Sequence, residues 1–280
     1  MYFRTNVELR PQWSLLGQPN SKQYQPPFTK GGEAIGESDG PKLLTILTGP
    51  SAYQGYILPI MTKHGTKIPK NFLRIVTNVR SQVPKPLQGL FTKSEGKLVG
   101  GTIDRWTRTI YTVEAPSLRD ATRLQYALHE AVHVLAHPVV PPKNCPRICV
   151  GTFQGAYGTG FGEGATQVIT ESIMDDQNIS RYYRDQPYEA FTAPVRQIIK
   201  IFSLAIFARA YFWGEIDEFT KIMEARWGNA WRNVANFTSA KETKRALAEI
   251  KRLEDAHQQR LWNRGPKGDF PSPSRFSRIA

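Results

Sequence analysis

Hydrophobic residues follow two different spacings along the chain, and the change between them falls near residue 115. From residue 41 to that point, short β-branched runs are separated by clusters of Gly, Pro, Asn and Lys, a pattern typical of strands. The four runs are Leu43–Thr48, Tyr56–Ile60, Leu73–Val79 and Leu98–Ile103. The segment Arg105–Glu114 alternates between two faces and, with the GKLVGGTID sequence before it, predicts an antiparallel hairpin. We therefore predict a small mixed sheet in this part of the chain.

Helical spacing dominates the rest of the sequence. Ser117 followed by Asp120 resembles a capping box, and apolar residues then recur three and four positions apart until Pro138 ends the helix near His137. A connection rich in Pro and Gly runs from 138 to 162. Further helices are predicted at 163–177, 193–213, 215–227 and 239–262. The C-terminal half is therefore expected to be mainly helical.

Three of the five histidines of the chain fall near the end of the helix that starts after Ser117. His129 and His133 are four residues apart, so their imidazoles project from one helix face at the spacing that lets both bind one tetrahedral Zn²⁺. Glu130 follows the first histidine and can contact a water on the metal without binding the metal itself. This is the HExxH arrangement of zinc peptidases. The alternative is a pair of core histidines bonded to backbone carbonyls, with Glu130 in an ion pair.

A catalytic zinc usually keeps three protein ligands and one water, so a third ligand is required. Val139 occupies the position of the third histidine of a metzincin, which excludes that class, and the order of the motif excludes the inverted zincins. Thirty residues after His133, the segment Gly162–Gln167 (GEGATQ) leads from a Gly-rich loop into a predicted helix. Glu163 in this segment is the candidate third ligand.

Two other residues remain alternatives for that position. His137 is nearly in step with the first two histidines, although it also suits a role at the end of the helix. Glu171 lies two turns into the next predicted helix, and it can instead hold a ligand histidine by its second ring nitrogen.

On HEAVH and GEGAT the chain resembles the gluzincin peptidases, in which a Glu on a helix downstream of HExxH is the third ligand. It is similar in particular to aminopeptidase-like members and to small bacterial metallopeptidase domains. The likeness covers ten residues and the order sheet, active helix, loop, ligand helix, and it departs at Gly162, where those families commonly have Asn. The resemblance implies an α+β, zincin-like fold with an N-terminal mixed β-sheet, zinc on His129, His133 and Glu163, and a helical C-terminal half that closes the cleft.

The resemblance also implies the roles of a zinc peptidase. The metal in such enzymes activates a water and polarises the scissile carbonyl, while Glu130 would take the proton of the water and pass it to the leaving amine. The family suggests a Tyr or His from the helical half as a donor to the oxyanion. Tyr211 is our candidate for that donor, and Tyr157 in the Gly-rich loop is the alternative. The substrate is then a protein or peptide.

These patterns divide the chain into four parts. They are an extended N-terminal arm at 1–40, the sheet plus active-site helix at 41–139, the loop with the third ligand and a helical subdomain at 140–262, and a basic disordered tail at 263–280.

Charge adds a second functional hypothesis. The chain has 37 Lys and Arg against 24 Asp and Glu, a net charge of +13, and residues 61–110 and 241–280 hold much of the excess. Such a field favours anionic partners, although solubility alone also accounts for it. The alternative to a peptidase is therefore a non-catalytic basic module that binds nucleic acid or anionic surfaces, and the two roles can also coexist.

Composition narrows the class of protein further. With 40% hydrophobic and 22% charged residues, the chain is an ordinary globular protein rather than a collagen-like, coiled-coil or wholly disordered one. We find no transmembrane segment and no cleavable signal peptide in the sequence. Cys145 and Cys149 are close enough to bridge but equally suit free thiols. By analogy, these features fit a bacterial effector or toxin that is secreted or delivered with an acidic carrier or secretion-device protein, or else a cytoplasmic enzyme.

Overall fold

The computed structural model describes residues 39–62, 74–78, 101–104, 109–113, 120–136, 151–179 and 189–264. The helices are α1 (Asp39–Thr48), α2 (Gln54–Met61), α4 (Asp120–Leu135), α5 (Thr152–Tyr157), α6 (Thr159–Asp176), α7 (Glu189–Phe202), α8 (Leu204–Ala208), α9 (Ile216–Trp227), α10 (Trp231–Ser239) and α11 (Thr243–Arg264). Two short segments accompany them, the π-helix η4 (Arg209–Trp213) and the 3-10 helix η5 (Gly228–Ala230). The strands are β1 (Arg74–Asn78), β2 (Gly101–Asp104) and β3 (Thr109–Val113).

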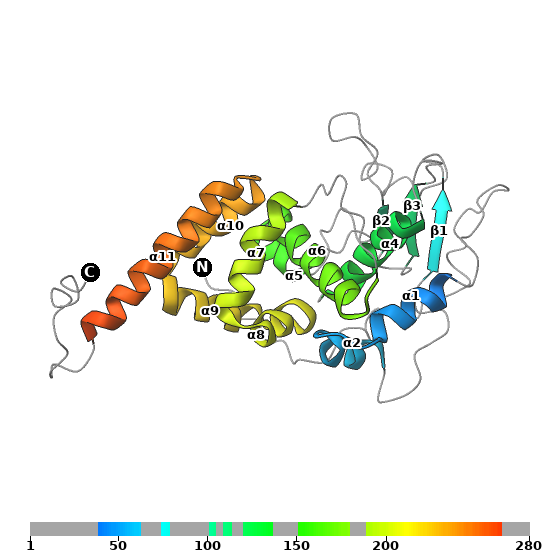
Figure 1. The fold of residues 1–280 in the computed structure, drawn as a ribbon, viewed down its shortest axis with the longest axis horizontal. Helices are drawn as coiled ribbons and strands as arrows, with labels where there is room; N and C mark the ends of the chain where they lie inside the picture. Colours follow the sequence, from blue (N-terminus) through cyan, green and yellow to red (C-terminus); the bar gives the residue numbers. More distant parts are fainter. Residues whose placement is uncertain are drawn as a thin grey trace, which may run out of the picture.

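The α+β, zincin-like class predicted from the sequence is wrong, because the described residues form an all-α helical bundle. The three strands have only five, four and five residues. They make one small sheet beside α4 at one end of the molecule, and the helices from α5 to α11 fill the rest (Figure 1). The sheet is therefore an addition to the bundle and not half of its core.

The error arises mainly at two apolar runs, Leu43–Thr48 and Tyr56–Ile60, which fold as parts of α1 and α2. In the first run Leu43, Ile46 and Leu47 are buried, and they are three and four positions apart, which is the spacing of one helix face. A short apolar run fits a strand or a helix equally well by periodicity alone. Packing against the bundle selects the helix here.

The predicted hairpin is confirmed in the small sheet. Strand β2 pairs antiparallel with β3, with Ile103 opposite Ile110, and β1 pairs parallel with the other edge of β3. The side chain of Ile110 is fully buried, and α4 packs against β2 and β3. The sheet therefore supports the helix that carries the HExxH motif.

The described end of the predicted Gly-rich connection, residues 151–162, is mostly helical. Gly158 separates α5 from α6 with a φ of +92°, a left-handed conformation that side chains disfavour. One turn into α6, Gly164 lets α7 approach closely, since a Cβ there would lie 2.7 Å from the carbonyl oxygen of Phe191. The glycines therefore serve close helix packing. As a result α6 is central to the bundle and packs against α4, α5, α7 and α10.

The long helix predicted at 193–213 is interrupted. Ser203 has a φ of 75°, and it separates α7 from α8, which continues directly into η4. Among the described residues no single helix is long and apolar enough to cross a membrane, although α7 and the α8–η4 segment, bent by 118°, meet the length and composition limits as a pair. Helix α10 was not predicted, and α11 corresponds to the predicted helix at 239–262.

Some features singled out from the sequence lie outside the described residues: the arm up to residue 38, the tail from residue 265, Ser117, His137, Cys145 and Cys149. The division of the chain into four parts stays a prediction.

Candidate metal centre

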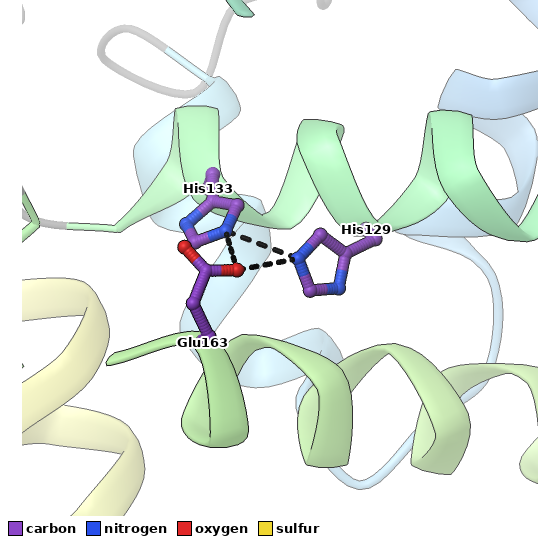
Figure 2. A group of neighbouring side chains, drawn as sticks. All are labelled: His129, His133 and Glu163. Carbon is purple, nitrogen blue, oxygen red and sulfur yellow. Dashed lines mark hydrogen bonds and ion pairs between the residues drawn. The ribbon is translucent and has the colours of Figure 1, made fainter. Parts of the chain in front are cut away.

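Three side chains from two helices converge at the contact between α4 and α6. Figure 2 shows His129 and His133 on one helix, pointing toward Glu163 on the other. Glu163 Oε2 lies 3.2 Å from Nε2 of His129 and 3.3 Å from Nε2 of His133, and the two nitrogens are 3.1 Å apart. Imidazole and carboxylate groups both bind divalent metals, and Glu163 comes from a segment thirty residues or more beyond the two histidines.

The three distances fit one metal ion. A tetrahedral zinc with bonds of 2.0–2.1 Å holds its ligand atoms about 3.3–3.4 Å apart. The three observed separations, 3.1 to 3.3 Å, are within a few tenths of an ångström of that geometry. A single ion could therefore bind all three atoms with only small side-chain adjustments.

The hydrogen bonds of His129 indicate which of its ring nitrogens carries the proton. Its Nδ1 lies 2.9 Å from Oε1 of Gln167, an amide oxygen that can only accept, so Nδ1 donates. The amide is oriented by its other end, because Nε2 of Gln167 donates to Glu171 at 2.9 Å. A neutral His129 thus has its free lone pair on Nε2, the nitrogen that faces Glu163.

The partners of His133 lead to the same assignment. Oγ1 of Thr166 lies 3.0 Å from the carbonyl oxygen of Gly162, 3.1 Å from Nδ1 of His133 and 2.7 Å from the hydroxyl of Tyr211. The carbonyl can only accept, so all three contacts are satisfied together when Thr166 donates its one proton there and accepts from the other two. Nδ1 of His133 is then protonated, and its Nε2 lone pair faces the same point.

The electrostatics of the cluster favour a positive charge between the three side chains. Burial lowers the pKa of His129, but the hydrogen bond and charge of Glu163 raise it more, so it lies above its usual value of 6.5. Burial raises the pKa of Glu163, but the His133 and His129 imidazoles hold it well below its usual range. A positive charge between these atoms, whether a proton or a metal ion, is therefore stabilised by the cluster.

The cluster is open on one side. The side chain of His129 is 2% exposed, whereas those of His133 and Glu163 are 12% and 23% exposed. In the part of the chain that the structure describes, no other His, Cys, Asp or Glu completes the group. Structural zinc sites have four protein ligands, whereas catalytic sites have three and an open position. The described residues therefore offer three candidate ligands and a partly exposed side.

The other residues predicted for the site lie around this cluster or away from it. Glu130 is on α4 beside His129, near enough for its charge to raise the pKa of His129. Tyr211 contacts Thr166 on the Nδ1 side of His133. The hydroxyl of Tyr157 lies 2.7 Å from Oγ1 of Thr220 on α9, and this described contact is not with the cluster.

Sequence reasoning missed Thr166 and Gln167, although both are in the GEGATQ segment. The two residues follow Glu163 by three and four positions, which places all three on one helix face. That spacing was a usable signal. Glu171 was considered as a residue that holds the second ring nitrogen of a ligand histidine. Its carboxylate instead accepts from Gln167, and Gln167 contacts Nδ1 of His129.

No protein-family model matches the sequence, and no curated protein or solved structure is significantly similar to it. The resemblance to gluzincins therefore rests on the buried His129, His133 and Glu163 triad, which could hold a metal.

Proposed function

We propose that this protein is a zinc-dependent peptidase, with His129, His133 and Glu163 as metal ligands and Glu130 as general base. The observation that carries the proposal is the convergence of three lone-pair atoms at tetrahedral spacing, with one side of the group exposed. Two imidazoles and one carboxylate form the protein ligand set of catalytic zinc in several hydrolases.

The same ligand set also serves non-haem iron, so the neighbouring residues decide between the two. Glu130 follows the first ligand directly and is on the helix that carries both histidines. A carboxylate beside a metal-bound position, but outside the ligand set, is suited to accept a proton from water. This favours hydrolysis over oxygen chemistry.

In the proposed reaction, the side chains of the protein orient the metal ligands and transfer the proton of the attacking water. Zinc, when bound, activates water and polarises a carbonyl. The Glu130 carboxylate accepts the water proton and returns it to the leaving amine, so it has to remain near the open side of the triad. The Nδ1–H bonds of His129 and His133 keep both Nε2 lone pairs directed at the metal position.

Elemental analysis and hydrolysis of a labelled, unfolded protein such as fluorescent casein test the proposal together. Purified full-length wild type should bind one zinc, and Glu163→Ala should lose it. Glu130→Gln should keep the zinc while kcat/KM falls on the order of 10²–10⁴-fold, the usual contribution of a general base. Glu189→Gln, at an exposed residue on α7, is the matched control and should be unaffected. A wild type that stays metal-free in excess zinc, or undiminished hydrolysis by Glu130→Gln, would overturn it.

A further inference from the structure

One face of α6 supplies a ligand and both residues that contact the outer nitrogens of the histidines. Glu163, Thr166 and Gln167 are at positions i, i+3 and i+4, opposite the i, i+4 histidine pair of α4. Thr166 is fully buried and Gln167 is almost so. Because both side chains are buried, the hydroxyl of Thr166 and the amide of Gln167 form their hydrogen bonds with protein atoms, among them the ring nitrogens of the two histidines.

The contact to His129 continues outward through two more side chains. Gln167 donates to Oε1 of Glu171, and the other carboxylate oxygen of Glu171 binds Arg196 of α7. Glu171 is 2% exposed, so its charge needs the guanidinium, which is itself partly exposed. This chain of contacts, which we name the Gln167 relay, runs from the surface of α7 to the metal ligand.

The contact to His133 also continues into the helical half. Tyr211 lies in the π-helix η4 and is buried, and its hydroxyl lies 2.7 Å from Oγ1 of Thr166. When Thr166 gives its one proton to the Gly162 carbonyl, it accepts from the hydroxyl of Tyr211 and from Nδ1 of His133. We name these contacts the Thr166 relay.

We propose that Thr166 and Gln167 are positioning residues, which fix the two ligand histidines as Nδ1–H tautomers and thereby set the affinity of the site for its metal. The inference rests on the proposed metal site. Without its acceptor, a buried imidazole can turn or move its proton to Nε2, and the lone pair is then lost to the metal. The contacts also give Tyr211 a positioning role through Thr166, and the oxyanion role suggested by the resemblance stays a prediction.

The chain offers a matched pair for the test. Thr166 and Thr170 are both fully buried on α6, one turn apart, and Thr170 donates only to the backbone carbonyl of Thr166. Thr166→Val and Thr170→Val therefore each remove one buried hydroxyl of the same type. Zinc affinity of the full-length protein is measured by competition with a chelator, after circular dichroism has shown that each variant is folded.

We expect Thr166→Val to bind zinc about 10–100-fold more weakly than wild type, the usual effect of losing an outer partner of a ligand histidine, and Thr170→Val to bind as wild type. Thr166→Ser keeps the hydroxyl and should restore most of the affinity, which a merely structural role would not require. Gln167→Met keeps the length of the side chain without its acceptor and should weaken binding to a similar degree.

The outcomes separate the two proposals. If wild type binds zinc, and Thr166→Val and Gln167→Met bind as tightly as Thr170→Val, the relays are wrong while the metal site stands. If wild type binds no zinc, both fail. Should Thr166→Val not fold, Tyr211→Phe replaces it. That variant leaves Thr166 free to turn its proton toward His133, so a several-fold loss of affinity supports the Thr166 relay and no change overturns it.

Discussion

Two clusters of polar side chains link helices in this protein, and they differ in how hydrogen-bond donors and acceptors are paired. Between α9 and α11, the carboxylate of Glu254 accepts from Nε and Nη2 of Arg226 at 2.7 and 2.5 Å and from Nε1 of Trp227 at 2.6 Å. Every contact there joins a donor to an acceptor. Between α4 and α6, the neutral tautomers of His129 and His133 point lone pairs at a carboxylate oxygen.

This difference in pairing suggests different roles for the two clusters. The hydrogen bond from Arg226 is the main cause that lowers the pKa of Glu254, so this pair is complete with protein atoms alone. The three side chains of the α4–α6 cluster could hold a metal ion. The first cluster ties α11 to the bundle, whereas the second offers a possible ion site between its side chains. Measurements with and without zinc should therefore separate them.

The largest expected effect is stabilisation of the wild type by zinc. Free zinc at about 1,000 times its Kd should raise the free energy of unfolding by about 4 kcal/mol, because only the folded chain brings the three ligands together. Thermal unfolding with EDTA or with excess zinc measures it. The Glu163→Ala variant should show no increment, whereas Glu254→Ala should be less stable overall and still gain the full increment from zinc. An equal increment in Glu163→Ala would show that zinc binds elsewhere.

The effect of pH on stability should have opposite signs in the two states of the metal centre. Because the pKa of His129 is raised in the fold, its pairing with Glu163 stabilises the metal-free protein below the usual pKa of 6.5, and this is lost as pH rises through the raised value. Zinc binds neutral histidines. The stabilisation that zinc adds should therefore decrease as pH falls, by about 1.4 kcal/mol per pH unit for each histidine that takes up a proton.

The Glu254 cluster should respond only at more acid pH. The pKa of Glu254 lies below its usual value of 4.5, so its contribution is present above 4.5 and is lost as pH falls through the lowered value. Denaturant titrations from about pH 2 to 9, with zinc and with EDTA, should resolve both transitions, the one from His129 above its usual pKa of 6.5 and the one from Glu254 below 4.5. Identical curves with zinc and with EDTA would contradict this account.

The α4 ligands were predictable from the sequence because their geometry is local. His129 and His133 need only a helix to bring them together, and that helix had a strong apolar period. Glu163 is a long-range partner, and it was predicted only because a Glu in a Gly-rich segment resembled a known family. The structure brings these three residues together although the fold class expected from that resemblance was wrong. The proximity of the three side chains was thus predicted correctly, whereas the scaffold around them was not.

The parts that failed depend on tertiary contacts. The run Leu43–Thr48 has the same apolar content as a strand, and only burial against the bundle selects the helix. The glycines of 155–162 were interpreted as a loop, yet they allow helices to approach one another, which no local pattern shows. The proton assignment of the histidines came only from atomic distances to Thr166 and Gln167.

A third expected effect replaces an acceptor oxygen with an amide donor in each cluster, with EDTA present and at a pH above the raised pKa of His129. Glu254→Gln should lower the free energy of unfolding by about 1–3 kcal/mol, because charged hydrogen bonds from Arg226 and Trp227 are lost. Glu163→Gln brings an N–H toward lone pairs of His129 and His133, so it should be neutral or stabilising. Equal destabilisation by the two variants would show that the metal-free centre is already complete.

The last expected effect concerns how closely α6 must lie to its neighbours. A Cβ on Gly164 would meet the Phe191 backbone at 2.7 Å, so Gly164→Ala should cost about 1–3 kcal/mol by overpacking. Gly164 follows Glu163 directly, so a shift of α6 should also weaken zinc binding while leaving the Glu254 cluster unchanged. Gly55→Ala on α2, where a Cβ would have no heavy atom within 4 Å, is the matched control and should stabilise by about 0.4–1 kcal/mol. Urea unfolding measures the stability of the two variants, and competition with a chelator measures their zinc affinity. If Gly164→Ala loses stability but keeps full zinc affinity, the spacing of α6 matters for the bundle and not for the metal centre.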